Sequence, residues 1–408
     1  MTSQPDTATP GVHTWNIDDL PALQFDPLLA KLLAEEPVAR IRLPYFSDHE
    51  AWLVTRYEDV KLVTSDPRFS REELVDRTVT SMLSEPVASK LALGYADPPY
   101  HTKLRKVINK AFTGRHMKRL RPMAEQTAGE LLDAVERHGP PADLMELLHK
   151  PFPLAVIGDL LGVPREDRAR VAPWTDTILS STADPAASRA ARAEVRAYIV
   201  ELLRSRSGAK GEESEDLAGV LAQACDEGEI TEDVAVSLAT IIMVSAAHAV
   251  RYNSANMVYM LLTHPEHLAR LRARPELLPQ AVDELLRHIP HRNGVGLARI
   301  ATEDVEVGGV LIRQGEAVYA SYLTANRDPE VFENPEVLDF DREALSHLSF
   351  GHGPHHCMGA MMARMESEVM LSGLLTRFPG LRLAEPPEKT VFQSSGTIRG
   401  PQSLLVTW

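Results

Sequence analysis

The chain has 408 residues, 44% of them hydrophobic, and its 57 acidic against 43 basic residues give a formal net charge of -14. The hydrophobic content is enough for one large or two ordinary cores, and the negative charge argues against general binding to nucleic acids or to membrane surfaces. Two cysteines exclude a disulfide framework and indicate a reducing compartment.

The first part of the chain predicts a small β region. Residues 1 to about 20 are polar and contain prolines, which predicts a loosely packed arm, and they lack the basic and apolar segments of a signal peptide. We therefore expect a cytoplasmic protein. Apolar runs at residues 38–43 and 51–56 predict two strands, and Ser47 and Asp48 favour a turn that joins them in a hairpin.

A short helix is expected over residues 57–65, and an irregular stretch follows at residues 69–93, of the kind that often covers a binding site. The next helix begins near residue 97 and places His101 and Arg105 on one face, where two cationic donors can bind a carboxylate. An ordinary surface pair is the alternative interpretation.

Residues 101–122 form a basic stretch in an otherwise acidic chain. They hold eight lysines or arginines and no acidic residue, namely Lys103, Arg105, Lys106, Lys110, Arg115, Lys118, Arg119 and Arg121. Such a run is usually a solvated helix face. It would also suit docking of an acidic electron donor, and nucleic acid is a remote third option.

The middle of the chain is helical in period. Residues 117–206 predict helices interrupted at the prolines near 140, 151 and 164, and a polar loop follows at 205–215. A long helix is expected from Thr231 to about His264, and it is too apolar to lie on a surface. A further helix over residues 275–288 carries Glu284 and Arg287 three residues apart, which by default form a surface ion pair of little worth.

Alternating strand patterns follow at residues 300–319, and residues 403–408 predict a last strand. The balance of elements is therefore mainly α with a smaller β region. We expect a single domain over residues 1–408.

A glycine-rich loop around Cys357 is the most informative stretch of the sequence. Phe350 lies seven residues before the cysteine, Gly353 four before and Gly359 two after, and a helical pattern runs from 360 to 378. Glycines allow the backbone to pass close to a flat cofactor, and a thiolate at a helix start suits an iron ligand. The plain alternative is that Cys357 is a small buried hydrophobic residue without a chemical role. The neighbouring histidines make a poor tetrahedral zinc site, since the ligands would be adjacent.

The spacing Phe-x-x-Gly-x-x-x-Cys-x-Gly resembles the haem-binding signature of the cytochrome P-450 superfamily. Glu284 and Arg287 match its Glu-x-x-Arg motif, 73 residues before the cysteine (357 minus 284), and residues 339–342 resemble the segment that joins this motif, although Leu338 replaces a common aromatic. The resemblance implies the cytochrome P-450 fold, with haem b between the central helix and the Cys loop. It also implies electrons from NAD(P)H through a ferredoxin reductase and a ferredoxin.

The resemblance implies roles for individual residues. Cys357 would ligate the iron, Phe350 would pack near the haem, Gly353 and Gly359 would shape the loop, and Glu284 with Arg287 would hold the proximal side. Cationic hydrogen-bond donors suit the buried haem propionates, and those implied are His101, Arg105, Arg299 and His355.

Residues 59–69, 289–297 and 399–408 are similar to the actinobacterial biflaviolin synthase group and to related enzymes that couple cyclodipeptides. This similarity implies oxidative C–C or C–N coupling of aromatic rings in secondary metabolism such as antibiotic biosynthesis. Tryptophan-containing cyclodipeptides are the expected substrates. A naphthol such as flaviolin and ordinary hydroxylation are the alternatives, and a haem sensor without turnover is disfavoured because the proximal motifs are complete.

The central helix departs from the family pattern. His248 stands where an acid is usual and Ala249 where a threonine is usual, so the helix lacks the alcohol that commonly delivers a proton. Three routes to the missing proton remain open. A substrate hydroxyl, N–H or bound water would replace the alcohol, which is the route that we favour. Alternatively, His248 would shuttle protons, or the enzyme would use peroxide directly. Candidate substrate contacts are Arg71, Ser245, Ala246, His291, Arg292, Asn253 and Ser254.

Overall fold

The computed structural model describes residues 11–15, 20–82, 90–179, 184–208, 215–291, 295–342, 346–393 and 398–408. Its α-helices are α1 (Pro27–Glu35), α2 (Tyr57–Ser65), α3 (Tyr100–Ile108), α4 (Gly114–His138), α5 (Pro151–Leu161), α6 (Arg168–Leu179), α7 (Pro185–Arg206), α8 (Leu217–Asp226), α9 (Glu232–Thr263), α10 (Pro265–Ala273), α11 (Leu278–His288), α12 (Tyr322–Ala325) and α13 (Ala360–Arg377).

The described strands are short. They are β1 (Val12–Thr14), β2 (Val38–Arg42), β3 (Ala51–Val54), β4 (Phe69–Ser70), β5 (Ala142–Asp143), β6 (Arg299–Ala301), β7 (Val305–Val307), β8 (Val310–Ile312), β9 (Ala317–Ala320), β10 (Arg382–Leu383) and β11 (Leu405–Thr407). The main sheet has the order β1-β2-β3-β9-β6-β4, and the remaining strands form a three-stranded and a two-stranded sheet. The prediction of a mainly α protein with a smaller β region is confirmed.

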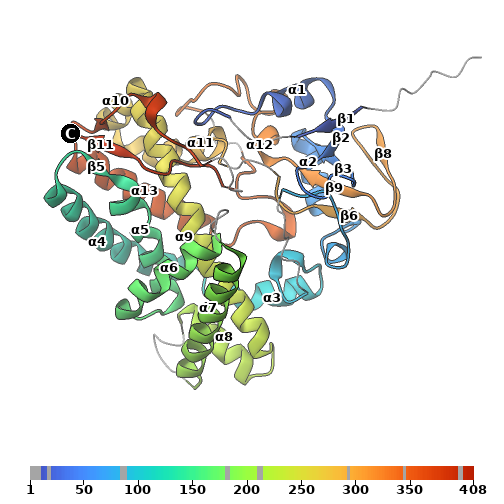
Figure 1. The fold of residues 1–408 in the computed structure, drawn as a ribbon, viewed down its shortest axis with the longest axis horizontal. Helices are drawn as coiled ribbons and strands as arrows, with labels where there is room; N and C mark the ends of the chain where they lie inside the picture. Colours follow the sequence, from blue (N-terminus) through green and yellow to red (C-terminus); the bar gives the residue numbers. More distant parts are fainter. Residues whose placement is uncertain are drawn as a thin grey trace, which may run out of the picture.

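The main sheet and most of the helices lie on opposite sides of the molecule. Figure 1 shows α4 to α8 with α13 on one side, β1, β2, β3, β6 and β9 on the other, and α9 running through the helical part. The two parts have separate cores: one cluster of buried apolar side chains joins the helices, and two smaller clusters cover the sheet.

The long central helix α9 has 32 residues and follows the expected bounds. Thr231 caps its start by accepting a hydrogen bond from the backbone N–H of Val234, and Pro265 begins the next helix. α9 packs against α5, α6, α7, α8 and α13. By length and composition it would pass for a membrane span, but 56% of its apolar window is buried inside the protein, as in a core helix.

The expected hairpin is confirmed, since β2 and β3 pair antiparallel with Val38 opposite Val54.

The prediction of a loosely packed arm is wrong for residues 11–15, because β1 pairs in parallel with β2 and Trp15 is 2% exposed. Its indole N–H donates to the Asp26 carboxylate, 2.7 Å away. A three-residue strand is too short to show alternation in sequence. Residues 1–10 and 16–19 lie outside the described residues.

The predicted helix boundary at Pro151 is confirmed, because a five-residue π-helix over Met145–His149 ends just before it. Pro153 does not interrupt a helix, since it lies inside α5. Pro151 is the first residue of α5, where a missing N–H costs nothing because the first N–H groups of a helix have no partner within it. Residues 205 and 206 belong to the end of α7 rather than to a loop, and residues 209–214 lie outside the described part of the chain.

Candidate functional site

The Cys357 loop is held between α2 and α13. The backbone N–H of Cys357 donates to the carbonyl of Phe350 over 2.8 Å, and Gly359 caps the start of α13. The thiol therefore lies just before the positive end of an 18-residue helix, where a thiolate is favoured. Cys357 is exposed rather than buried, which argues against the plain alternative of a small buried hydrophobe.

The two glycines of the loop have different reasons to be there. Gly353 has φ +71, and a Cβ at this position would lie 2.4 Å from the carbonyl oxygen of Thr64 at the end of α2. Close packing of the loop on α2 therefore requires a glycine at this position. A Cβ at Gly359 would lie 4.0 Å from the Cys357 sulfur, so a glycine here keeps the space beside the sulfur open.

Phe350 is fixed by charged and aromatic neighbours. The guanidinium of Arg364, on α13, lies over its ring at 4.6 Å, and the ring of His347 lies 5.8 Å away. Phe350 is half-buried against the helical core. The aromatic ring thus connects the loop to α13, and its packing near the haem stays a prediction.

A cluster of arginine and histidine side chains lies near the loop, and its positive charge comes from the arginines because both histidines are neutral at pH 7. The rings of His101, on α3, and His355 are 4.3 Å apart, and Nη1 of Arg105 donates to the carbonyl of His356 over 2.9 Å. Burial lowers the pKa of His355 to about 2, with Arg71, His101, Arg299 and Arg105 adding to the shift. Burial, followed by Arg105 and Arg71, lowers the pKa of His101 to about 4. The four predicted propionate contacts therefore lie together.

Arg71 belongs to this cluster as well. Its pKa is lowered to about 9, first by burial and then by the nearby Arg299, and its Nη1 donates to the carbonyl of Gly94 over 3.2 Å. Sequence reasoning had suggested Arg71 as a substrate contact and missed this grouping, because nothing in the spacing places residue 71 beside residue 299.

Several hydrogen-bond donors of the cluster have no partner among the described residues. They are Nε2 of His101, Nη2 of Arg299 and Nε of Arg71, and all three are buried. Buried polar groups are nearly always satisfied, so this cluster calls for acceptors beyond the described residues. Two carboxylates such as the haem propionates meet that requirement, and the residues present fit the cofactor that the sequence implied.

Behind the loop, Glu284 and Arg287 form a buried network. Both side chains of the pair are almost inaccessible, 4% and 2% exposed, so the default of a surface ion pair is wrong. Nη1 of Arg287 donates to the carbonyls of Asn326 and Pro335. Residues 339–342 join the network, because the N–H of Asp339 and Nε of Arg342 donate to the Glu284 carboxylate.

On α9, Ser245 and Ala249 lie one turn apart on one face. Ser245 is exposed, and Ala246 and Ala249 are half-buried. His248 instead packs edge-on against the ring of Tyr252, with centroids 4.8 Å apart. Its pKa is lowered to about 4, first by burial and then by Arg251, so the imidazole is neutral at pH 7. The ordinary pKa near 6.5 that sequence reasoning assumed for a proton shuttle is therefore wrong.

The remaining candidate contacts fall in different places. Ser254 is 1% exposed and hydrogen-bonded to His149 over 2.8 Å, which removes it from any cavity lining. His291 is buried, with Nε2 3.2 Å from the carbonyl of Leu286. Asn253 is half-buried on α9. Arg292 lies outside the described residues.

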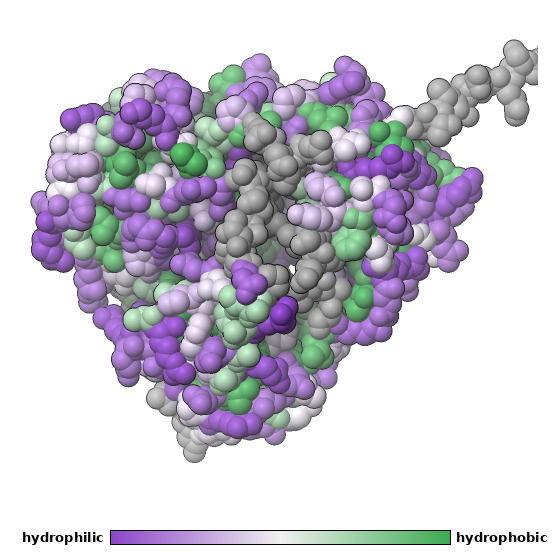
Figure 2. All heavy atoms as spheres, in the orientation of Figure 1, coloured by the Kyte–Doolittle hydropathy of each residue, from purple (hydrophilic) through white to green (hydrophobic). Residues whose placement is uncertain are grey.

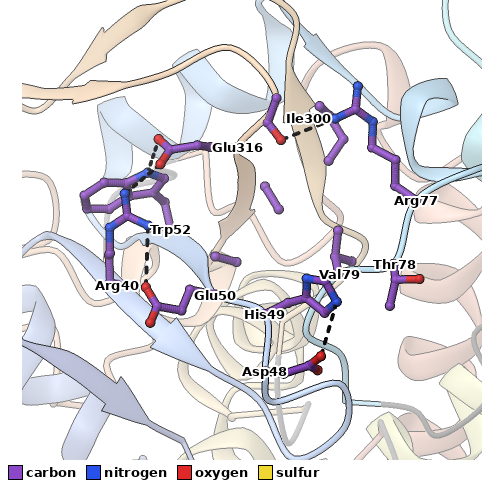
Figure 3. A pocket seen from close by; sticks show the side chains of 13 residues that line it. Arg40, Asp48, His49, Glu50, Trp52, Arg77, Thr78, Val79, Ile300 and Glu316 are labelled. Carbon is purple, nitrogen blue, oxygen red and sulfur yellow. Dashed lines mark hydrogen bonds and ion pairs between the residues drawn. The ribbon is translucent and has the colours of Figure 1, made fainter.

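A cavity of about 610 Å³ lies on the sheet part, away from this cluster. Figure 3 shows its polar side chains pairing with one another: Arg40 lies between Glu50 and Glu316, and the Trp52 indole donates to Glu316. Ile300 lines it, whereas the adjacent Arg299 points to the opposite face of β6. On the molecular face of Figure 2, polar residues predominate and apolar ones are scattered. We therefore place the candidate site at the Cys357 loop.

The fold and the site define a class of protein: a mainly helical chain with a cysteine loop at a helix start, a cationic cluster that calls for carboxylates, and a buried ion network behind the loop. The family model described as cytochrome P450 (here written P-450) matches residues 36–407. The chain belongs to the cytochrome P-450 family and is a monooxygenase of secondary metabolism. The family implies haem iron with a cysteine thiolate ligand and reducing equivalents from NAD(P)H, and bacterial members generally use a ferredoxin and its reductase.

Known relatives cover the whole chain. It is 44% identical to biflaviolin synthase of Streptomyces coelicolor over 100% of both chains. It is 46% identical to nocardicin C N-oxygenase of Nocardia uniformis subsp. tsuyamanensis, over 97% of this chain and 98% of the relative. A solved cytochrome P-450 described as having biaryl coupling reactivity is 43% identical, with a TM-score of 0.91 over 98% of this chain and 100% of that chain.

Proposed function

We propose that this protein is a haem-thiolate oxidase that joins aromatic rings by C–C or C–N bonds. Cys357 is the iron ligand, and the haem b propionates accept hydrogen bonds from His101, Arg299 and Arg71, with Arg105 and His355 beside them. The unpartnered donors of the cationic cluster support this placement. Glu284 and Arg287 hold the loop segment behind the ligand.

Bound haem supplies one-electron oxidation of the substrate when electrons and oxygen are available. Joining two rings forms one bond, breaks two bonds to hydrogen and removes two electrons and two protons from the pair. Together with two electrons from NAD(P)H and two further protons, these would reduce O2 to two molecules of water, so no oxygen atom needs to enter the product. The protein's part is to hold both rings at reacting distance and to exclude competing partners. The part of α9 that carries Ser245, Ala246 and Ala249 suits this task, because these side chains are small and not fully buried.

The observation that carries the proposal is Ala249. It lies on the same face of α9 as Ser245, and its methyl group can neither donate nor relay a proton. The neighbouring His248 is neutral at pH 7 and packs on Tyr252. Position 249 therefore offers no hydroxyl, although Ser245 on the same face carries one. The phenol O–H or indole N–H of the substrate would supply the proton instead, and coupling uses that group directly.

The substrate class stays a prediction. Tryptophan-containing cyclodipeptides are the substrates that we propose first. The similarity to biflaviolin synthase favours a naphthol such as flaviolin as the second candidate. The 46% identity to an N-oxygenase favours transfer of oxygen, of which hydroxylation is the simplest form, as the third.

For electron supply, we propose that a ferredoxin docks on the basic stretch of α3 and α4 in the cytoplasm. The lysines at 103, 106, 110 and 118 and Arg115 are exposed. These charges lie on the segment that also carries His101 and Arg105. An acidic partner would be attracted to this face, and the attraction would weaken with added salt.

A spectral titration of the purified ferric protein tests the substrate class. A low-to-high-spin shift with a tryptophan cyclodipeptide alone supports indole coupling, and a shift with a naphthol alone supports phenol coupling. A shift with neither removes both ring classes. Product analysis by mass then decides between the reactions, since coupling joins two substrate masses less two hydrogens and hydroxylation adds one oxygen. Reduction under carbon monoxide must give the ferrous complex a Soret band at about 450 nm if Cys357 is the ligand.

A further inference from the structure

A second cavity, of about 450 Å³, lies behind the central helix and is bounded by α4, α5, α6 and α9. Its apolar wall includes Leu131 from α4, Leu154 and Ala155 from α5, and Ala172 from α6. All four side chains are only partly buried. A concave site of this size, with an apolar wall on one part and polar or charged side chains on the rest, has the character of a small-molecule pocket. The polar and charged lining residues are Thr127, Glu146, Lys150, Arg168, Thr175, Asp176, His248 and Arg251.

The cavity lies mainly on another side of α9 from the small residues Ser245 and Ala249, where we place the haem. The residues of α9 that line it are Ala247, His248 and Arg251. At 100° per residue, Ala247 and Arg251 lie about 120° or more around the helix from both Ser245 and Ala249, whereas His248 lies about 60° from Ser245. The cavity therefore lies mainly on another side of α9 from Ser245 and Ala249, and His248 stands at its edge nearest to them.

Two cations lie in the wall of this cavity. Arg251 is 14% exposed and its Nη1 donates to the carboxylate of Asp176, which is 54% exposed. Lys150 pairs with Glu146 at the rim, and burial, followed by the charge of Arg251, lowers the pKa of Lys150. The two cations thus lie close enough for the positive charge of one to disfavour the charged state of the other, although each has an acidic partner.

Arg251 has an unused donor. Its Nε is buried and has no hydrogen-bond partner among the described residues. Leaving a charged donor unsatisfied in a buried position is costly. An anionic group between Arg251 and Lys150 would relieve the repulsion between the two cations, and a small rotation of the guanidinium would let it accept from that donor as well.

We propose that this cavity binds a small organic anion with an apolar ring. Its carboxylate or phenolate is held by Arg251 and Lys150, and its ring packs on Leu154, Ala155 and Ala172. The ligand would touch His248, the residue beside Ala249. This site is additional to the proposed oxidase function and does not depend on it.

The test uses the holoprotein in its ferrous carbon monoxide form, which is diamagnetic and has the iron position filled. Alanine methyl groups are labelled with ¹³C, and phenylacetate is titrated against its uncharged isostere phenylacetamide. The methyl signals of Ala155 and Ala172 are expected to shift with phenylacetate, with a dissociation constant on the order of 1 mM or tighter. Phenylacetamide is expected to bind at least about tenfold more weakly.

Variants locate the binding. Arg251→Gln and Lys150→Gln are each expected to weaken phenylacetate binding at least about tenfold, and Ala155→Phe fills the cavity and abolishes it. Arg170→Gln is the matched control, since this exposed arginine of α6 is not among the lining residues. The methyl signal of Ala249 reports any binding on the haem face.

The proposal is overturned if the Ala155 and Ala172 signals do not move, or if phenylacetamide binds as well as phenylacetate. It is also overturned if Lys150→Gln and Ala155→Phe both bind phenylacetate like the unaltered protein. A variant that unfolds is recognised from its spectrum, and the remaining variants then decide the outcome.

Discussion

Glu284 and Arg287 form a two-point ion pair that is almost completely hidden from solvent. Nε of Arg287 donates to one carboxylate oxygen and Nη2 to the other, each over 2.7 Å. The same carboxylate accepts from Arg342 at 3.2 Å and from the N–H of Asp339 at 3.0 Å. Since both charges have been taken out of water, each depends on the other for its stability in the interior.

Removing one partner of this pair is therefore expected to be strongly destabilising. Glu284→Gln leaves the guanidinium of Arg287 buried without its counter-charge, and we expect a loss of about 3–5 kcal/mol in the free energy of unfolding. Urea unfolding of the holoprotein measures it. Glu385→Gln, which removes an exposed partner of Lys389, is expected to change stability by no more than about 0.5 kcal/mol. Similar losses for both variants would contradict a buried network.

A second prediction concerns the unpartnered Nε2 of His101. If this donor binds a propionate, His101→Phe removes a hydrogen bond to a charged group and leaves the packing against His355 largely in place. Release of haem to an excess of apomyoglobin is then expected to be about tenfold faster. Exposed His138 provides the control variant, His138→Phe. Equal rates for both variants would remove His101 from the cofactor site.

The sequence was informative wherever a motif has fixed local geometry. The Cys357 loop, the hairpin of β2 and β3, and the capped ends of α9 all follow from residues close together in the chain, and each prediction agrees with the structure. The grouping of His101, Arg105, Arg299 and His355 followed from the family resemblance, because distant residues carry no signal of contact in one sequence.

The sequence was misleading where tertiary burial decides the outcome. The ion pair of Glu284 has the spacing of an ordinary surface pair, and only the packing of residues 326–342 around it makes it a buried network. Gly353 is explained by the carbonyl of Thr64, which is almost 300 residues earlier in the chain. His248 has the ordinary pKa of a histidine until α9 is surrounded by other helices. These contacts arise only when segments far apart in sequence meet.

The third prediction concerns the pH dependence that comes from His248. Its pKa is about 4 in the folded protein and close to 6.5 in an unfolded chain. Above about pH 6.5 neither the folded nor the unfolded state binds the proton, so His248 does not change the free energy of unfolding with pH. As pH falls from there towards about 4, only the unfolded chain binds the proton, and stability is lost.

We therefore expect His248→Gln to lose less stability than the unaltered protein between about pH 7 and pH 5. Thermal unfolding at a series of pH values measures this difference, and His138→Gln, at an exposed position, is the control. Identical pH profiles for His248→Gln and the unaltered protein would show that burial does not lower this pKa. A separate comparison of product formed per NAD(P)H consumed in His248→Phe tests any role in catalysis; an unchanged ratio and turnover remove it.

Glu366 provides the last prediction. This residue of α13 is 0% exposed, and neither carboxyl oxygen has a hydrogen-bond partner among the described residues. Burial raises its pKa well above 4.5, so the folded protein keeps the proton. An unfolded chain releases that proton once the pH exceeds about 4.5, and its free energy then falls relative to the folded state. Stability is lost as pH rises from that value up to the folded pKa.

Glu366→Gln keeps the shape and the neutral charge but has no proton to lose. We expect the variant and the unaltered protein to be close in stability at about pH 4.5, and the variant to gain by up to about 1.4 kcal/mol for each pH unit above that value, until the folded pKa is reached. Glu35→Gln, on the exposed side of α1, is the control. Urea unfolding at several pH values gives the curves. Curves that stay parallel would mean that Glu366 is ionised in the folded protein, and a partner for its charge would then have to lie outside the described residues.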